Sequence, residues 1–129
     1  MPREIITSKR APAAVGAYSQ AVRAGDFVYV SGQIPLNPET GEIVFADIRE
    51  QTERILVNIR NILQEAGMGL EDVVRTTVYL ELMDDLSRVN EVYGRFFGEN
   101  PPARAAVEVA RLPKDVAIEI DAIAYKRQE

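Results

Sequence analysis

The strongest periodic pattern in the chain is an apolar stripe that begins after Asp47 and ends before Gly67. Its members recur every three or four positions, which is the spacing of one face of an α-helix. They are Ile48, Thr52, Ile55, Ile59, Ile62, Leu63 and Ala66. Asp47 is a suitable N-cap with Glu50 three residues later, and Gly67 is a suitable C-terminal stop. The pattern predicts a helix between Asp47 and Gly67.

A second stripe predicts another helix, between Asp84 and Gly98. Asp84 and Asp85 carry the negative charge that favours a helix N-terminus, and Gly98 provides the stop. The buried side of this helix is expected to contain Leu86, Val89, Tyr93, Phe96 and Phe97.

Runs of β-branched and aromatic residues predict strands before, between and after the helices. These strands span residues 18–24, 27–31, 73–82, 103–110 and 116–125, and a further short strand starts at Ile5 and Ile6. Gly25-Asp26 fits a tight hairpin turn between the first two long strands. Residues 73–82 carry few charges, so we expect a central strand that is covered on both faces.

The element order β-β-α-β-α-β-β predicts an α+β fold class, in which a mixed sheet has both helices packed on one face. Two sets of apolar side chains alternate along the strands: Val28, Val30, Val74 and Val78 on one face, and Tyr29, Val73 and Tyr79 on the other. Because the helices cover only one face, we expect another copy of the chain to cover the second.

The length of 129 residues predicts a single domain over residues 1–129. The chain contains no cysteine and no histidine. A disulfide scaffold and a Cys/His zinc or haem site are therefore excluded, and no EF-hand spacing is present. Catalysis would have to use carboxylate, hydroxyl, Arg, Lys, Tyr or backbone groups. Composition does not exclude Mg²⁺ or Ca²⁺ bound by carboxylates, although we expect no metal and no organic cofactor.

The net charge of −5 disfavours nucleic acid as a partner, because phosphate binding requires clustered Lys and Arg and these are scattered here. Residues 1–4 lack the apolar run of a signal peptide. No apolar stretch approaches the length that spans a bilayer. We therefore expect a cytoplasmic protein without membrane association.

Two charged residues interrupt otherwise apolar strands. Arg104 lies in Pro-Ala-Arg-Ala-Ala-Val, and Glu119 shares one strand face with Asp121, Ile123 and Tyr125. In one interpretation both face solvent on an ordinary sheet. In the other they face a cleft, where Arg104 binds a carboxylate through two hydrogen bonds and Glu119 holds and polarises a water molecule. The pattern leaves both interpretations open.

Four further polar or small positions also allow an ordinary structural interpretation. Ser31-Gly32 is typical of a strand-to-loop junction, and Tyr18 is an aromatic residue that favours strands. Asn90 lies beside the apolar stripe of the second helix, where a boundary residue reaches solvent. In a site, Ser31 would supply a hydroxyl and Gly32 would let the backbone approach a ligand closely.

Taken together, six segments resemble the Rid (YjgF) family of reactive-intermediate deaminases over nearly the whole chain. They are residues 11–18, 30–35, 89–90, 102–104, 107–115 and 118–122. Ser-Gly-Gln-Ile-Pro at 31–35 and Arg-Leu-Pro-Lys-Asp at 111–115 are the most specific of them. The resemblance implies a chorismate-mutase-like subunit and a homotrimer whose sheets face inward, with an active site at each subunit interface.

The same resemblance implies an activity, the hydrolysis of 2-iminobutanoate and 2-iminopropanoate to 2-keto acids and ammonia. These imines form from enamines that pyridoxal-phosphate dehydratases release from serine or threonine. Arg104 matches the arginine that binds the substrate carboxylate, and Glu119 matches the glutamate that positions the attacking water. The remaining pocket positions match Tyr18, Ser31, Gly32, Asn90, Ala105 and Ala106.

The family resemblance leaves several alternatives to test. Many relatives have a cysteine where this chain has Ala106, so a thiol cannot be essential if this protein is active. The same cleft could serve a regulatory module that binds a keto acid or an amino acid. An endoribonuclease or translation inhibitor is disfavoured by the acidic charge and the absence of histidine. A chaperone would need exposed apolar surface, which an assembled trimer would bury.

Overall fold

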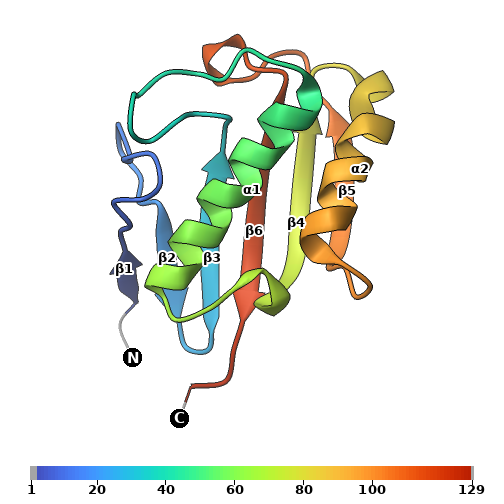
Figure 1. Ribbon diagram of the computed structural model, residues 1–129. Helices are drawn as coiled ribbons and strands as arrows, with labels where there is room; N and C mark the ends of the chain where they lie inside the picture. The colour runs from blue at the N-terminus through green and yellow to red at the C-terminus, as the bar shows by residue number, and fades with distance from the viewer. Residues whose placement is uncertain (1–2, 129) are drawn as a thin grey trace.

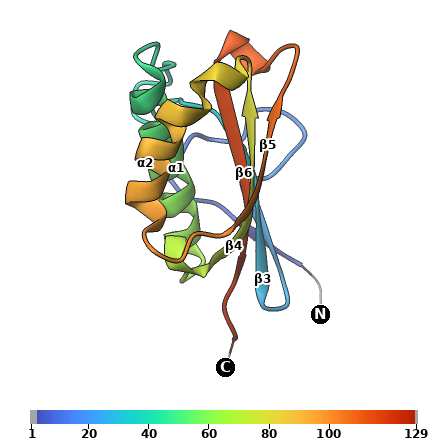
Figure 2. The ribbon, with the colours of Figure 1, turned by 90° about the vertical axis from the view of Figure 1, so that its right-hand side faces the viewer.

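In the computed structural model, residues 3–128 form a six-stranded sheet with two helices on one face (Figures 1 and 2). Across the sheet the strands are β1 (Glu4–Ile6), β2 (Ala21–Ala24), β3 (Phe27–Gln33), β6 (Ile118–Tyr125), β4 (Val73–Leu80) and β5 (Ala103–Glu108). Strands β4 and β5 pair in parallel and the other neighbours are antiparallel. The predicted α+β fold class is confirmed. Residues 1, 2 and 129 of the predicted domain lie outside the described residues.

Helix α1 (Ile48–Glu65) forms where the first apolar stripe predicts it. The Asp47 side chain accepts a hydrogen bond from the Arg49 backbone N–H at 2.7 Å, so the capped residue lies one position before the predicted Glu50. The seven members of the stripe are all buried. Gly67 has a φ of 76°, a left-handed conformation that suits glycine and ends the helix as predicted.

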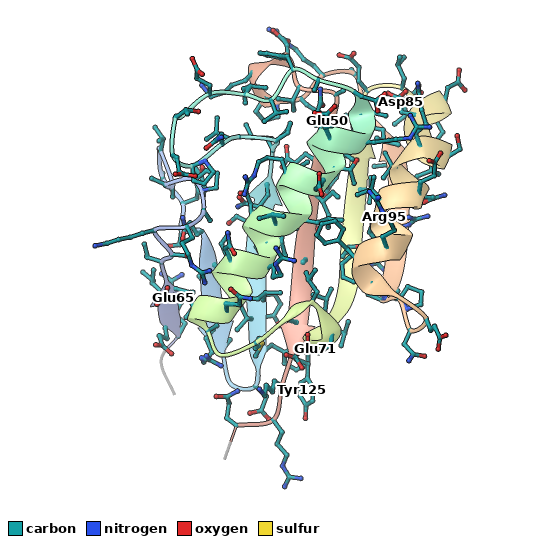
Figure 3. All side chains as sticks on the ribbon, in the orientation of Figure 1. Glu50, Glu65, Glu71, Asp85, Arg95 and Tyr125 are labelled. Atoms are coloured by element: carbon teal, nitrogen blue, oxygen red, sulfur yellow. The ribbon has the colours of Figure 1, made fainter. Side chains whose placement is uncertain are left out.

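Helix α2 (Leu86–Phe97) packs beside α1, and Gly98, with a φ of 70°, ends it. Its beginning differs from the prediction. Residues Met83–Asp85 form a short 3-10 turn, and Asp85 pairs with the Arg88 side chain instead of capping the helix (Figure 3). Across residues 3–128, no helix combines the length and apolarity that a membrane span requires.

The core lies between the helices and the sheet. Its largest fully buried side chains are Ile55, Leu56, Ile59, Ile62, Leu63, Leu80, Ile118 and Ile120. Burying an aliphatic side chain of this size contributes about 1.5–3 kcal/mol to folding. Alternate residues of β6 belong to this core, so Glu119 and Asp121 point to the opposite side of the sheet, as their spacing predicts.

The ends of strands β2 and β3 differ from the prediction. Strand β2 begins at Ala21 and not at residue 18, since the buried Gln20 side chain binds Ser8 N–H at 2.6 Å and Pro12 C=O at 2.7 Å. Strand β3 continues to Gln33 through a register shift.

Strands β4, β5 and β6 are each two residues shorter than predicted. Strand β4 ends at Leu80 and β5 ends at Glu108. Strand β6 begins at Ile118, and residues 113–115 form a 3-10 turn two residues before it.

We call the sheet face without helices the outer face. Phe27, Tyr29 and Tyr125 lie on it with 38%, 46% and 41% of their surfaces exposed. The prediction that residues 73–82 are covered on both faces is wrong for a single chain, in which Val74 and Leu82 are 44% and 56% exposed. A register shift between Val73 and Arg75 also reverses two assignments: Val73 is buried and Val74 is exposed. The extra residue of a bulge moves the side-chain alternation by one position.

Candidate active site

An open cleft of about 570 Å³ lies where the segment between β1 and β2 meets the end of β3 and the beginning of β6. Part of that segment loops out on the side of the sheet opposite the helices (Figure 2), whereas Arg10 hydrogen-bonds to Gln64 and Asn61 of α1. The lining is mostly apolar and includes Pro12, Ala13, Val15, Ile34, Leu36 and Pro113. Four of the predicted site residues line it as well: Tyr18, Ser31, Gly32 and Glu119.

Glu119 is fitted tightly against the backbone of β3. A Cβ atom placed on Gly32 would overlap the Glu119 carboxyl group, so any larger residue would require this carboxyl group to move. Gly32 lies within the register shift between Val30 and Gln33, where β3 departs from regular pairing with β6. The close approach of a ligand to Gly32 stays a prediction, because the group packed against Gly32 here is the Glu119 side chain of the same protomer.

The half-buried position of Glu119 affects its protonation. Burial raises the pKa of the Glu119 carboxyl above its usual 4.5, and the nearby Asp121 carboxylate raises it further. A carboxyl group with a raised pKa accepts protons more readily than an ordinary glutamate. This property suits a group that takes a proton from water and returns it later in a reaction.

Ser31 and Tyr18 line the same cleft as Glu119. The Ser31 hydroxyl donates a hydrogen bond to Ser19 C=O at 2.6 Å, and its backbone N–H donates to Gln20 C=O at 2.9 Å. The hydroxyl is therefore held in place while its oxygen can still accept a hydrogen bond. Tyr18 is 54% exposed, and it lies in the irregular segment before β2 and not at the predicted start of a strand.

Arg104 and Asn90 form a second group near the edge strand β5, with Asn90 on helix α2. Arg104 lies on the edge strand β5, opposite the buried Thr76, so its side chain is on the helix side. Its Nη1 donates a hydrogen bond to Asn90 Oδ1 at 2.7 Å, and its guanidinium lies 4.8 Å from the centre of the Tyr93 ring. The amide and the ring hold the guanidinium in a fixed direction at the sheet edge.

Ala105 and Ala106 follow Arg104 along the same edge strand. Ala106 is opposite Val78 and packs against the core, while Ala105 is opposite Thr77. Alternation along the strand therefore directs Ala105 to the outer face.

Within one chain the predicted residues form two separate groups. Tyr18, Ser31, Gly32 and Glu119 line the cleft, whereas Asn90 and Arg104 lie on the opposite side of the sheet, beyond β4. Only the family resemblance assigned these two groups of residues to one site; no pattern within the sequence did so. A single protomer therefore carries both halves of the predicted site without joining them.

The sequence analysis missed Lys114 as a cleft residue. Lys114 and Asp115 have φ values of 55° and 57°, which is a left-handed conformation that non-glycine residues rarely adopt. Hydrogen bonds stabilise the turn, including one from Arg111 Nε to Asp115 Oδ1 at 2.9 Å. The Arg-Leu-Pro-Lys-Asp segment was a visible signal, but residue spacing does not indicate that this turn reaches Glu119.

A hydrogen-bonded pair on the outer face was also missed. The Tyr79 hydroxyl donates to Asp121 Oδ2 at 3.0 Å. Burial raises the pKa of Tyr79, and its contact with Asp121 adds to the effect. Among residues 3–128, no group of three or more Cys, Asp or Glu side chains is arranged to hold a metal ion.

Comparisons with known proteins agree on one family. The model of the endoribonuclease L-PSP family matches residues 8–126. A RutC family protein of Pyrococcus abyssi is 58% identical, over 98% of this chain and 99% of its own length. RidA from an Antarctic Psychrobacter has a TM-score of 0.92 at 45% identity, with 95% of this chain and 99% of that chain covered. Escherichia coli TdcF, solved with bound serine, has a TM-score of 0.91 at 45% identity, covering 95% and 98%.

Proposed function

Because the chain belongs to the Rid (YjgF) family, we propose that it hydrolyses 2-iminobutanoate and 2-iminopropanoate to 2-keto acids and ammonia. The observation that carries the proposal is the half-buried Glu119 carboxyl, fitted against Gly32 in an otherwise mainly apolar cleft. The substrates are the imines that form from enamines released by pyridoxal-phosphate dehydratases. The bound serine of TdcF supports an amino-acid-sized ligand for this fold.

We further propose that the protein works as a homotrimer with its outer faces turned inward. The exposed aromatic side chains Phe27, Tyr29 and Tyr125 give the outer face the apolar character that an interface between copies requires. In this assembly, Arg104 of one copy meets the cleft of the next. The separation of Arg104 from Glu119 within one protomer supports this arrangement.

Arg104 then binds the substrate carboxylate through two charge-assisted hydrogen bonds. Its existing contacts with Asn90 and Tyr93 reduce the freedom that it loses when it binds. Backbone groups around Ala105 and Ala106 orient the imine, and Tyr18 and Ser31 shape the cleft and polarise the substrate.

Glu119 handles the protons of the reaction. Its carboxylate takes a proton from water as the oxygen bonds to the carbon of the protonated imine, and the C=N π electrons move to nitrogen. The protonated Glu119 then gives this proton to the amine of the tetrahedral intermediate. The C–N bond breaks, ammonia leaves, and Glu119 collects the hydroxyl proton as the C=O bond forms. That proton finally passes to ammonia, which gives ammonium and the keto acid. Positioning of water and imine supplies much of the acceleration.

The first experiment measures ammonia and keto-acid release from enamine that a threonine dehydratase generates from threonine. We expect faster release with the protein, and a loss of roughly 100-fold in kcat/KM for Arg104→Ala because the substrate carboxylate loses its partner. Glu119→Gln should lower kcat by a similar factor, roughly 100-fold, and change KM little. Arg95→Ala, on the exposed side of α2, is the matched control (Figure 3). No acceleration by a folded, assembled protein would refute the proposal.

The family description names RNA cleavage, which is the second activity to test. The net charge of −5 and the absence of histidine make the chain poorly suited to phosphate binding and to histidine-based acid–base catalysis. RNA cleavage that Glu119→Gln abolishes would favour the ribonuclease. Saturable binding of 2-ketobutyrate without turnover would favour a binding module.

A further inference from the structure

Asp121 lies two residues after Glu119 on the same side of β6. Both of its carboxylate oxygens accept hydrogen bonds from the neighbouring strand β4. The Tyr79 hydroxyl donates to Oδ2 at 3.0 Å, and Thr77 N–H donates to Oδ1 at 3.2 Å. The second contact is a backbone group, so the position of the Asp121 carboxylate is set by the sheet itself. Asp121 does not line the cleft.

Glu119 is held in a different way. Its carboxyl contacts the Gly32 backbone, and among residues 3–128 no hydrogen-bond donor reaches it. A carboxyl group without internal partners keeps its oxygens available for water and substrate. The two neighbouring carboxylates of β6 therefore differ: one is fixed by the sheet and one is free to react.

The titratable groups near Glu119 lie on β6, on β4, in the turn before β6 and in the N-terminal segment. Asp121 on β6 is the group of like charge that acts on Glu119, and Tyr79 on β4 is the residue directly paired with Glu119. Lys114 from the turn before β6 and Tyr18 from the N-terminal segment share the cleft. The adjoining part of β3, residues 31–33, is Ser-Gly-Gln and carries no charge.

We propose that Asp121 is a positioning residue that holds a second negative charge beside Glu119 and thereby sets the pH range in which Glu119 accepts a proton. The inference rests on the imine hydrolysis proposed above. A negative neighbour makes ionised Glu119 less favourable, so the protonated form persists to higher pH. An assembly that covers the outer face lowers the local dielectric and strengthens this repulsion.

The test compares the pH dependence of kcat/KM for the intact protein and Asp121→Asn. Asn removes the charge and keeps a similar shape, with Oδ1 still able to accept from Thr77 N–H. Since Glu119 must be ionised to take a proton from water, activity falls as the pH drops through its pKa. We expect the acidic limb of the profile to move to lower pH in Asp121→Asn, by roughly half a unit to one unit.

Two variants control for structure. Asp121→Glu keeps the charge and should keep the acidic limb near that of the intact protein. Asp84→Asn removes one negative charge from an exposed position outside the cleft and should leave the limb unchanged. If Asp121→Asn does not assemble, Asp121→Thr is a second neutral replacement that suits a strand.

A 13C NMR titration of the Glu119 side-chain carboxyl provides a readout that is independent of activity. The midpoint should be lower in Asp121→Asn than in the intact protein, and identical midpoints would overturn the proposal. If the midpoint moves but no variant hydrolyses imines, the role of Asp121 stands and the proposed function fails. The two failures are therefore distinguishable.

Discussion

At the scale of single residues, the Glu119 carboxyl group occupies space that a side chain on Gly32 would fill. The φ of Gly32 is not left-handed, so its backbone would accept other residues. The requirement for glycine comes from the carboxyl group packed against it. The Ser-Gly pattern in the sequence predicts a junction or a close approach, and only the fold reveals that Glu119 is the approaching group.

Gly32→Ala should therefore displace Glu119 without unfolding the protein. A misplacement of about 1 Å in a reacting group costs up to roughly 100-fold in rate, so we expect kcat/KM to fall by roughly tenfold or more. The control is Gly94→Ala, because a Cβ at that exposed position of α2 meets no atom within 4 Å. Equal kinetics for the two variants would show that the contact with Gly32 does not position Glu119.

At the scale of elements, the helices follow their sequence signals closely and the strands follow them less well. Helix α1 has an N-cap, a continuous apolar stripe and a left-handed glycine, all of which act within the helix or next to it. Strand ends depend on remote partners. The Gln20 side chain, just before β2, hydrogen-bonds to the backbone of Ser8 and Pro12, which lie 12 and 8 residues earlier in the chain.

The N-cap of α1 offers a test with a defined pH dependence. The hydrogen bond from Arg49 N–H lowers the pKa of Asp47 below its usual 3.8. A lowered pKa in the folded state means that ionised Asp47 stabilises the protein above about pH 4, and that this contribution disappears as the pH falls through the folded-state pKa. Asp47→Ala should lower Tm at pH 7, and Asp47→Asn, which keeps the acceptor, should lower it less.

The check is a series of thermal melts from pH 7 to pH 2 at constant protein concentration. The difference in Tm between the intact protein and Asp47→Asn should shrink toward the acid end of the series. A difference that stayed constant with pH would show that the charge of Asp47 does not contribute to the cap.

At the scale of the whole molecule, the two halves of the proposed site lie on opposite sides of one sheet. Glu119 belongs to the outer side and Arg104 to the helix side of the edge strand β5. A closed ring of copies can join the two halves if the edge of one protomer meets the cleft of the next. The proposed trimer therefore predicts that each active site needs residues from two chains.

Mixing two inactive variants tests this arrangement. Each site needs an intact Glu119 from one chain and an intact Arg104 from its neighbour. Arg104→Ala and Glu119→Gln chains are unfolded together in equal amounts and reassembled. A site then receives an intact Glu119 with a chance of one half and an intact Arg104 with a chance of one half, so about a quarter of the sites should be active. Each variant reassembled alone is the control. Mixed trimers that remain inactive, with mixing verified by native mass spectrometry, would place the site within a single chain.

The sequence by itself determined the features that depend on local interactions. Both helices, the α+β class and the alternation that separates Glu119 from the core residue Ile120 follow from spacing along the chain, and α1 also from its N-cap. Tertiary structure decided what depends on distant neighbours. It placed Lys114 beside the cleft and divided the predicted site residues between two sides of the sheet. A bulge in β4 also made Val73 buried and Val74 exposed, the reverse of the assignment from the sequence. The alternation of residues along a strand predicts which face of the sheet each side chain points to, but it does not predict which other strand is the neighbour.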